Sequence, residues 1–91
     1  MTDSGATLRT YLDRDELLVC PGVHDPLTAG VADAVGFDAI YMTGYGTSLS
    51  KTGYPDAGFI TMPEMIENAG NIQERIDVPL IADSDNGYGN A

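Results

Sequence analysis

The sequence predicts an α/β fold in which helices alternate with parallel strands. Three short apolar runs are separated by segments whose apolar residues recur at helical spacing. This alternation is typical of parallel strands joined by right-handed crossover connections. Three such strands leave sheet edges unpaired, and a complete (β/α)₈ barrel needs about 250 residues. We therefore expect residues 1–91 to be the first three strands, with an N-terminal helix, of a single (β/α)₈ TIM barrel domain.

The composition limits the classes of partner. The chain carries 14 acidic and 4 basic residues, for a net charge of −10. Nucleic acids and anionic membranes attract basic patches, so we expect neither as a partner. Cys20 is the single cysteine, which leaves no disulfide framework. No apolar run approaches the ~20 residues that span a bilayer, and the N-terminus does not resemble a signal peptide, so we expect a cytoplasmic protein.

The first predicted elements are a short helix and a strand. Ser4 is suited to cap a helix that carries Leu8, Tyr11 and Leu12 on one face. The apolar run 17–20 follows and ends at a Pro-Gly pair, which is typical of a buried strand.

A second helix is predicted from Asp25 to Gly36. Asp25 is a favoured N-cap, the proline after it suits the first helical position, and Gly36 is a typical helix stop. The residues expected on its buried face are Leu27, Val31, Ala34 and Val35.

A second buried strand is predicted over residues 39–42, ended by a Gly-Tyr-Gly turn at 44–46. The glycine spacing resembles a dinucleotide fingerprint only weakly, because position 49 is Leu, and we expect no helix to start there. A loop of about 15 residues, through 47–60, should follow. Loops of this length are usually functional, and we expect this one to act as a gate over bound substrate.

The last predicted units are a third helix and a third strand. Thr61 and Glu64 have the spacing of a capping box, and residues 79–82 read as the strand. The residues expected on the apolar face of the helix are Met62, Met65, Ile66, Ala69, Ile72 and Ile76.

Polar residues follow each predicted strand, where active sites of parallel α/β folds lie. Asp83 and Asp85 are two residues apart, so their carboxylates point the same way in an extended chain. Oxygen ligands without Cys or His suit a hard ion such as Mg²⁺. The alternative is a solvated acidic turn in an acidic protein. The Gly-Tyr-Gly turn can offer backbone N–H groups to a carboxylate or phosphate. His24 is more simply a hydrogen-bonded loop residue than a catalytic base, and no base stands beside Ser48 to make it a nucleophile.

Four segments in this order resemble the N-terminal part of the isocitrate lyase and phosphoenolpyruvate mutase superfamily, in particular its 2-methylisocitrate lyase-like members. The segments are LVCPGVHDPLTA (18–29), IYMTGYG (40–46), GYPDAG (53–58) and PLIADSDNGYGN (79–90). The resemblance implies a (β/α)₈ barrel, a homotetramer, Mg²⁺ as cofactor and a small carboxylate as substrate.

The resemblance also implies roles for particular residues. Thr43, Gly44 and Tyr45 match the segment that binds the substrate carboxylate, although the family commonly has Ser at the first position. Many of its lyases have Gly where this chain has Tyr45, which would narrow the pocket. Asp83 matches the principal metal-linked carboxylate and Asp85 its partner.

Two further positions match catalytic residues of the superfamily. Asp56 matches the acid of its P-D-x-G loop motif, and Tyr41 matches a tyrosine that lines the site and is a candidate proton-transfer group. The implied activity is Mg²⁺-dependent carbon–carbon cleavage of a 2-hydroxy tricarboxylate, such as a 2-methylisocitrate- or isocitrate-like acid, to an oxo acid and succinate. The alternatives are a phosphoenolpyruvate or carboxyphosphonoenolpyruvate mutase, an oxaloacetate decarboxylase or hydrolase, and an inactive fragment. A K-R-C-G-H motif would indicate a lyase, and it is not among these 91 residues.

Overall fold

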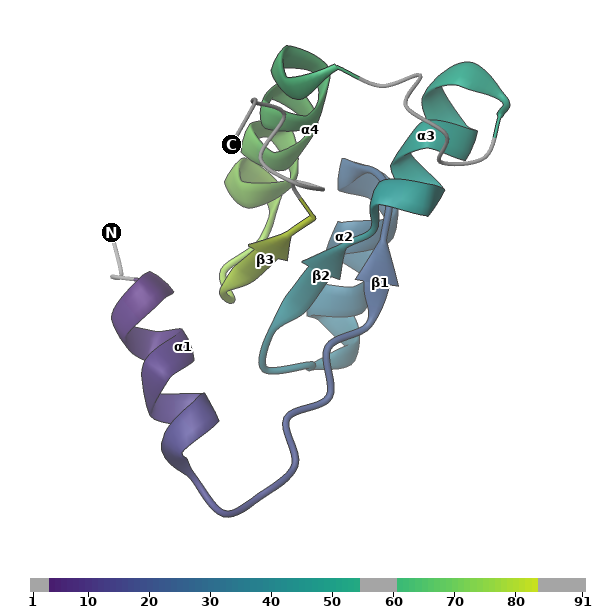
Figure 1. The fold of residues 1–91 in the computed structure, drawn as a ribbon. Helices are drawn as coiled ribbons and strands as arrows, with labels where there is room; N and C mark the ends of the chain where they lie inside the picture. Colours follow the sequence, from purple (N-terminus) through teal and green to yellow (C-terminus); the bar gives the residue numbers. More distant parts are fainter. Residues whose placement is uncertain (1–3, 55–60, 84–91) are drawn as a thin grey trace, which may run out of the picture.

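The computed structural model describes residues 4–54 and 61–83, which form a three-stranded parallel sheet with helices (Figure 1). The strand order is β1-β2-β3, so each strand lies beside the next one in the sequence. The strands are β1 (Gly22–Val23), β2 (Ile40–Met42) and β3 (Leu80–Ala82), and the helices are α1 (Ser4–Asp13), α2 (Pro26–Val35), α3 (Gly44–Thr52) and α4 (Met62–Arg75). The predicted α/β class with parallel strands is confirmed.

The core lies between the sheet and the pair of helices α2 and α4, which pack against each other and against the strands. Strand β2 supplies its largest part, since Ile40 and Met42 are fully buried and flank the half-buried Tyr41. Successive side chains of a strand point to opposite faces, so Tyr41 lies on the face that α2 and α4 do not cover. The other buried core residues are Val23, Ala29, Ala32, Met65, Ile72 and Ile76.

The predicted buried face of α2 is wrong. Leu27, Val31 and Val35 are 75%, 59% and 69% exposed, whereas the helix buries its small residues Ala29 and Ala32. Small side chains let a helix approach its neighbours closely, and here α2 contacts both α4 and the sheet. The large apolar residues therefore face away from the core that the described residues form. Met62 and Ile66 of α4 are likewise exposed, while the rest of the predicted α4 face is buried or partly buried.

The predicted loop after β2 is also wrong in its first half. Residues 44–52 form α3, which starts directly at Gly44 and ends at Gly53, whose φ is 77°. Thr43 caps this helix, and the buried Thr47 and Ser48 anchor it. Residues 55–60, which include Asp56 and the rest of the predicted gate, lie outside the described residues.

Strand β1 begins later than predicted. The apolar run 17–20 contains no strand, and Leu17 and Val19 are exposed; the pairing with β2 starts only at Gly22. Most other boundaries are confirmed. Asp25 caps α2 ahead of a proline, and Gly36 ends that helix in the left-handed region at φ 107°. Helices that begin and end on such residues fix where the strands between them start.

Helix α1 stands apart from the other helices (Figure 1). Arg14, just after it, is tied to the turn before β2 by a 2.8 Å ion pair with Asp38. The Arg14 guanidinium also lies 5.0 Å from the centre of the Tyr11 ring, a cation–π distance. Asp38 precedes β2 at the amino end of the sheet, so this ion pair is remote from the carboxyl ends of the strands. No helix among the described residues is long and apolar enough to cross a membrane.

Candidate active site

The first turn of α3 is built around the side chain of Thr43. Its hydroxyl oxygen accepts the N–H of Gly46 at 3.2 Å, and its carbonyl accepts the N–H of Thr47 at 2.9 Å. The N–H groups of Gly44 and Tyr45 fall in the part of a helix that has no intrahelical acceptors. They lie at the positive end of the helix dipole, directly after the carboxyl end of β2. This turn can therefore receive a carboxylate through backbone groups alone.

Asp83 lies beside this turn at the end of the neighbouring strand. Its N–H donates to the Met42 carbonyl at 3.1 Å, which continues the β2–β3 ladder one residue past Ala82. The register pairs Tyr41 with Ile81 and Met42 with Ala82, so Thr43 is next to Asp83. Paired residues of parallel strands share a face, and faces alternate along each strand. Tyr41, Thr43 and Asp83 consequently lie on the sheet face opposite α2 and α4.

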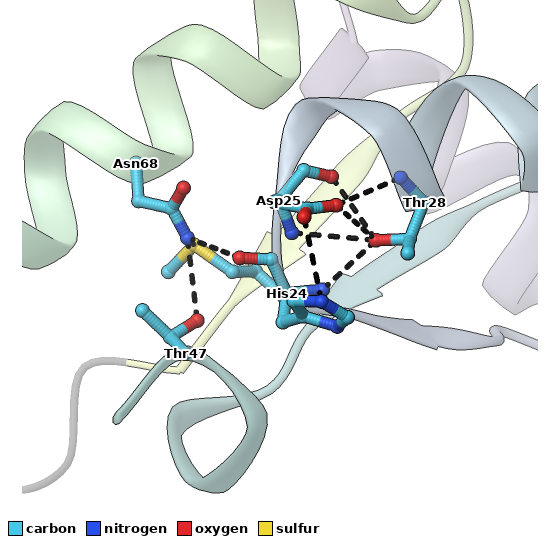
Figure 2. Close-up of polar contacts among 6 residues, drawn as sticks. His24, Asp25, Thr28, Thr47 and Asn68 are labelled. Atoms are coloured by element: carbon cyan, nitrogen blue, oxygen red, sulfur yellow. Dashed lines mark hydrogen bonds and ion pairs between the residues drawn. The ribbon is translucent and has the colours of Figure 1, made fainter. Parts of the chain in front are cut away.

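The loop between β1 and α2 lies close to the start of α3, and Figure 2 shows the polar contacts of its residues His24 and Asp25. Asp25 accepts the backbone N–H of Thr28 at 2.8 Å, and the Thr28 hydroxyl accepts the backbone N–H of His24 at 3.2 Å. The backbone N–H of Thr28 lowers the pKa of Asp25, and the Thr28 hydroxyl and His24 add to that effect against a smaller opposing effect of burial. The His24 ring lies 3.4 Å from the Asp25 carboxylate. These contacts agree with the interpretation of His24 as a hydrogen-bonded loop residue.

The N-cap of α3 and the β1–α2 loop leave no space for a side chain at Gly46. A Cβ on Gly46 would lie 2.6 Å from the Thr43 methyl and 3.2 Å from the Cβ of His24. Both distances are shorter than ordinary carbon contacts, so glycine is required for this close approach.

Sequence reasoning missed Asn68. This residue of α4 is 4% exposed and donates from its side-chain amide to the carbonyl of His24 at 2.9 Å and to the hydroxyl of Thr47 at 3.3 Å (Figure 2). The pattern that could have found it is its spacing: Asn68 falls three residues after Met65 and four before Ile72, on the buried face of the helix. A polar side chain on such a face needs buried partners.

The structure describes one of the two predicted metal-linked carboxylates, that of Asp83. Asp83 is half-buried and its carboxylate belongs to a strand end, which fits a hard cation that takes one or two carboxylates and completes its shell with water and substrate oxygens. Asp85, its predicted partner, lies outside the described residues, as does Asp56. Within residues 4–54 and 61–83 no three His, Cys, Asp or Glu side chains cluster. The donor type at Asp83 thus suits Mg²⁺, and Asp83 is the predicted metal-linked carboxylate that lies within the described residues.

Comparison with known proteins decides the family. A sequence profile described as phosphoenolpyruvate phosphomutase matches residues 8–91. The chain belongs to the phosphoenolpyruvate phosphomutase family. The resemblance seen in the four sequence segments is therefore confirmed. Among curated members, the 2,3-dimethylmalate lyase of Eubacterium barkeri is 49% identical over 98% of this chain and 31% of its own length. The chain thus spans about a third of the length of this relative.

Two solved structures share the backbone fold of this chain. The crystal structure of oxaloacetate acetylhydrolase superposes with a TM-score of 0.89 and 44% identity, covering 96% of this chain and 32% of that one. A phosphonopyruvate hydrolase in complex with oxalate and Mg²⁺ gives 0.90 and 35% identity, covering 98% and 31%. The proteins that this chain resembles thus include a lyase and two hydrolases, the matching profile is named for a mutase, and the chain spans about a third of each of these proteins.

Proposed function

We propose that this chain is the N-terminal part of a Mg²⁺-dependent lyase that cleaves a carbon–carbon bond of a small 2-hydroxy acid carrying two or three carboxylates. Residues 1–91 would form the first three strands of its (β/α)₈ barrel. The relationship to a 2,3-dimethylmalate lyase supports this activity class. The 2-hydroxy tricarboxylates that the sequence resemblance implied remain within this class.

The observation that carries the proposal is the juxtaposition of Thr43 and Asp83 at adjacent strand ends. The first turn of α3 offers the N–H groups of Gly44 and Tyr45, which stabilise a carboxylate without adding a titratable group. Asp83 lies next to it with a carboxylate that suits a cation. A 2-hydroxy acid has its hydroxyl and carboxylate on one carbon, so it can reach both sides of such a site at once.

The reaction class fits these groups. In a retro-aldol cleavage the substrate hydroxyl loses its proton, the C–C bond breaks, and the oxygen-bearing carbon becomes a carbonyl. The bonding pair moves to the leaving fragment, which a general acid then protonates. Mg²⁺, when bound, would lower the cost of the developing negative charge on the substrate oxygen.

Residues of this chain would share the remaining tasks. Asp83, with Asp85, would hold the cation in place, while Thr43 fixes the turn that receives the substrate carboxylate. Tyr41 lies on the same sheet face as Thr43 and is the candidate for proton transfer near the substrate. We propose Asp56 as a second catalytic residue on the strength of its motif.

A hydrolase or decarboxylase acting on oxaloacetate is the second candidate. The superposition on oxaloacetate acetylhydrolase at 44% identity favours it. Oxaloacetate carries a keto oxygen where the lyase substrates carry a hydroxyl, and both types chelate a cation through that oxygen and the neighbouring carboxylate. A phosphoenolpyruvate or carboxyphosphonoenolpyruvate mutase would bind the carboxylate of its substrate at the same first turn of α3. We further propose that the whole protein is a homotetramer, as the resemblance implies.

The proposal is tested by assaying the whole protein that carries these residues with Mg²⁺ against 2,3-dimethylmalate, 2-methylisocitrate, isocitrate and oxaloacetate. We expect cleavage of one of the three hydroxy acids to an oxo acid plus a carboxylate product, abolished by EDTA and restored by Mg²⁺. Turnover of oxaloacetate alone would replace the lyase proposal with the second candidate. Turnover of none of the four by the folded protein with Mg²⁺ would contradict both.

A further inference from the structure

Asn68 brings one buried amide to the carboxyl ends of two strands. It lies in the middle of α4, is 4% exposed, and shares its helix face with Met65 and Ile72. An amide on an apolar face costs free energy unless its hydrogens find acceptors. The positions of those acceptors therefore show what the residue holds together.

The acceptors of Asn68 come from three different elements. Its Nδ2 lies 2.9 Å from the His24 carbonyl, 3.3 Å from the Thr47 hydroxyl and 3.6 Å from the Met42 sulfur. His24 follows β1, Met42 ends β2, and Thr47 lies in the second turn of α3. Two amide hydrogens are shared among these partners; the bond to the His24 carbonyl has an ordinary length, and the bond to the Thr47 hydroxyl is slightly longer. Figure 2 shows the amide nitrogen between the two oxygens.

These partners flank the segment that presents the proposed carboxylate site. Thr47 comes immediately after residues 43–46, and its own N–H is bonded to the Thr43 carbonyl. Gly46 also lies close to His24, since a Cβ added at Gly46 would be 3.2 Å from the His24 Cβ. The start of α3 thus lies close to the β1–α2 loop at Gly46 and is linked to that loop at Thr47 through Asn68. A shift of this turn would require breaking the Asn68 contacts.

We infer that Asn68 is a positioning residue for the carboxylate site: it holds the first turn of α3 against the loop after β1, so that the N–H groups of Gly44 and Tyr45 keep one orientation. The inference rests on the proposed function for the identity of the bound group. The contacts themselves concern only the position of α3. Asn68 acts through Thr47 and His24 rather than by touching the substrate.

The test compares four variants of the whole protein, with oxalate plus Mg²⁺ as the binding probe. Asn68→Leu keeps the size of the side chain and removes the donor, while Thr47→Val removes one acceptor and Thr47→Ser retains it. Asn71→Leu, at an exposed position of the same helix, is the matched control. We expect Asn68→Leu to weaken oxalate binding at least tenfold and Thr47→Val severalfold. Thr47→Ser and Asn71→Leu should stay within twofold of wild type.

Amide hydrogen exchange without ligand provides the second measurement. In Asn68→Leu the amides of Gly46 and Thr47 should exchange at least tenfold faster, while those in the middle of α2 and in β2 keep their protection. Equal oxalate affinity of Asn68→Leu and Asn71→Leu would overturn the inference. So would a uniform rise of exchange over all elements, which marks a general loss of stability. Absence of oxalate binding in wild type would instead refute the proposed function, and exchange at Gly46 and Thr47 would then decide by itself whether Asn68 positions α3.

Discussion

The backbone N–H of Asp83 donates to the carbonyl of Met42 at 3.1 Å. This bond extends the sheet one residue beyond β3 and sets Asp83 beside Thr43, the cap of α3. A candidate cation ligand and a helix N-terminus suited to a carboxylate are therefore fixed relative to each other by backbone hydrogen bonds. Asp83 and the N-terminus of α3 can therefore move little relative to each other. A substrate that binds to both groups requires such a fixed geometry.

The cap of α3 can be tested at Thr43. Thr43→Val keeps the shape but removes the oxygen that accepts the N–H of Gly46 at 3.2 Å. Loss of an N-cap costs about 1 kcal/mol, and the freed turn should raise KM for the substrate more than it lowers kcat. Thr43→Ser retains the oxygen and should keep KM within about threefold of wild type. Equal KM values for the Val and Ser variants would contradict a role for the cap in substrate binding.

Gly46 and Gly70 form a matched pair of helical glycines. A Cβ at Gly46 would lie 2.6 Å from the Thr43 methyl, whereas nothing lies within 4 Å of one at Gly70. Thr43 cannot turn its methyl away without losing its capping bond. Gly46→Ala should therefore destabilise the protein by about 1–3 kcal/mol, while Gly70→Ala should stabilise it by about 0.5–1 kcal/mol. Chemical denaturation measures both, and a stabilised Gly46→Ala variant would show that the close approach is absent.

Asp25 should make stability depend on pH at the acid end. Its pKa is lowered in the folded state, mainly by the backbone N–H of Thr28, so ionised Asp25 favours folding. This contribution is present above the unfolded-state pKa of about 3.9 and is lost as the pH falls through the lower folded-state value. Melting temperatures from pH 2 to 6 should fall less steeply with acid in Asp25→Asn, which keeps a cap without a titrating group. Thr28→Val retains the backbone donor and should preserve most of the wild-type slope; an unchanged slope in Asp25→Asn would refute the linkage.

The sequence predicted the parts of the fold that local chemistry determines. Asp25 ahead of proline, the Thr61–Glu64 capping box and Gly36 mark helix ends because each satisfies orphan backbone groups or a left-handed turn by itself. The strand at residues 40–42 could be predicted because both of its faces carry apolar residues.

The errors have a common cause in tertiary packing. Two glycines lower the helix propensity of residues 44–46, but the Thr43 cap and the burial of Thr47 and Ser48 outweigh it, so α3 forms. In α2 the apolar pattern pointed to the large residues, whereas close packing on α4 selects the small ones such as Ala29. The role of Asn68 could not be predicted because its acceptors are separated from it by 44 and 21 residues.

A Mg²⁺ titration of turnover tests whether Asp83 binds the catalytic Mg²⁺, as we propose. Three forms of the whole protein are compared after EDTA treatment: wild type, Asp83→Asn and Asp77→Asn. Asp77 is an exposed acid before the same strand, and its contact with Asp33 uses only its backbone N–H. We predict that wild type and Asp77→Asn regain full turnover as Mg²⁺ is added. Asp83→Asn should lose most turnover at every Mg²⁺ concentration, with a melting temperature within a few degrees of wild type. Full turnover without Mg²⁺, or an Asp83→Asn curve that matches wild type, would contradict the claim and leave Asp83 as part of a solvated acidic turn.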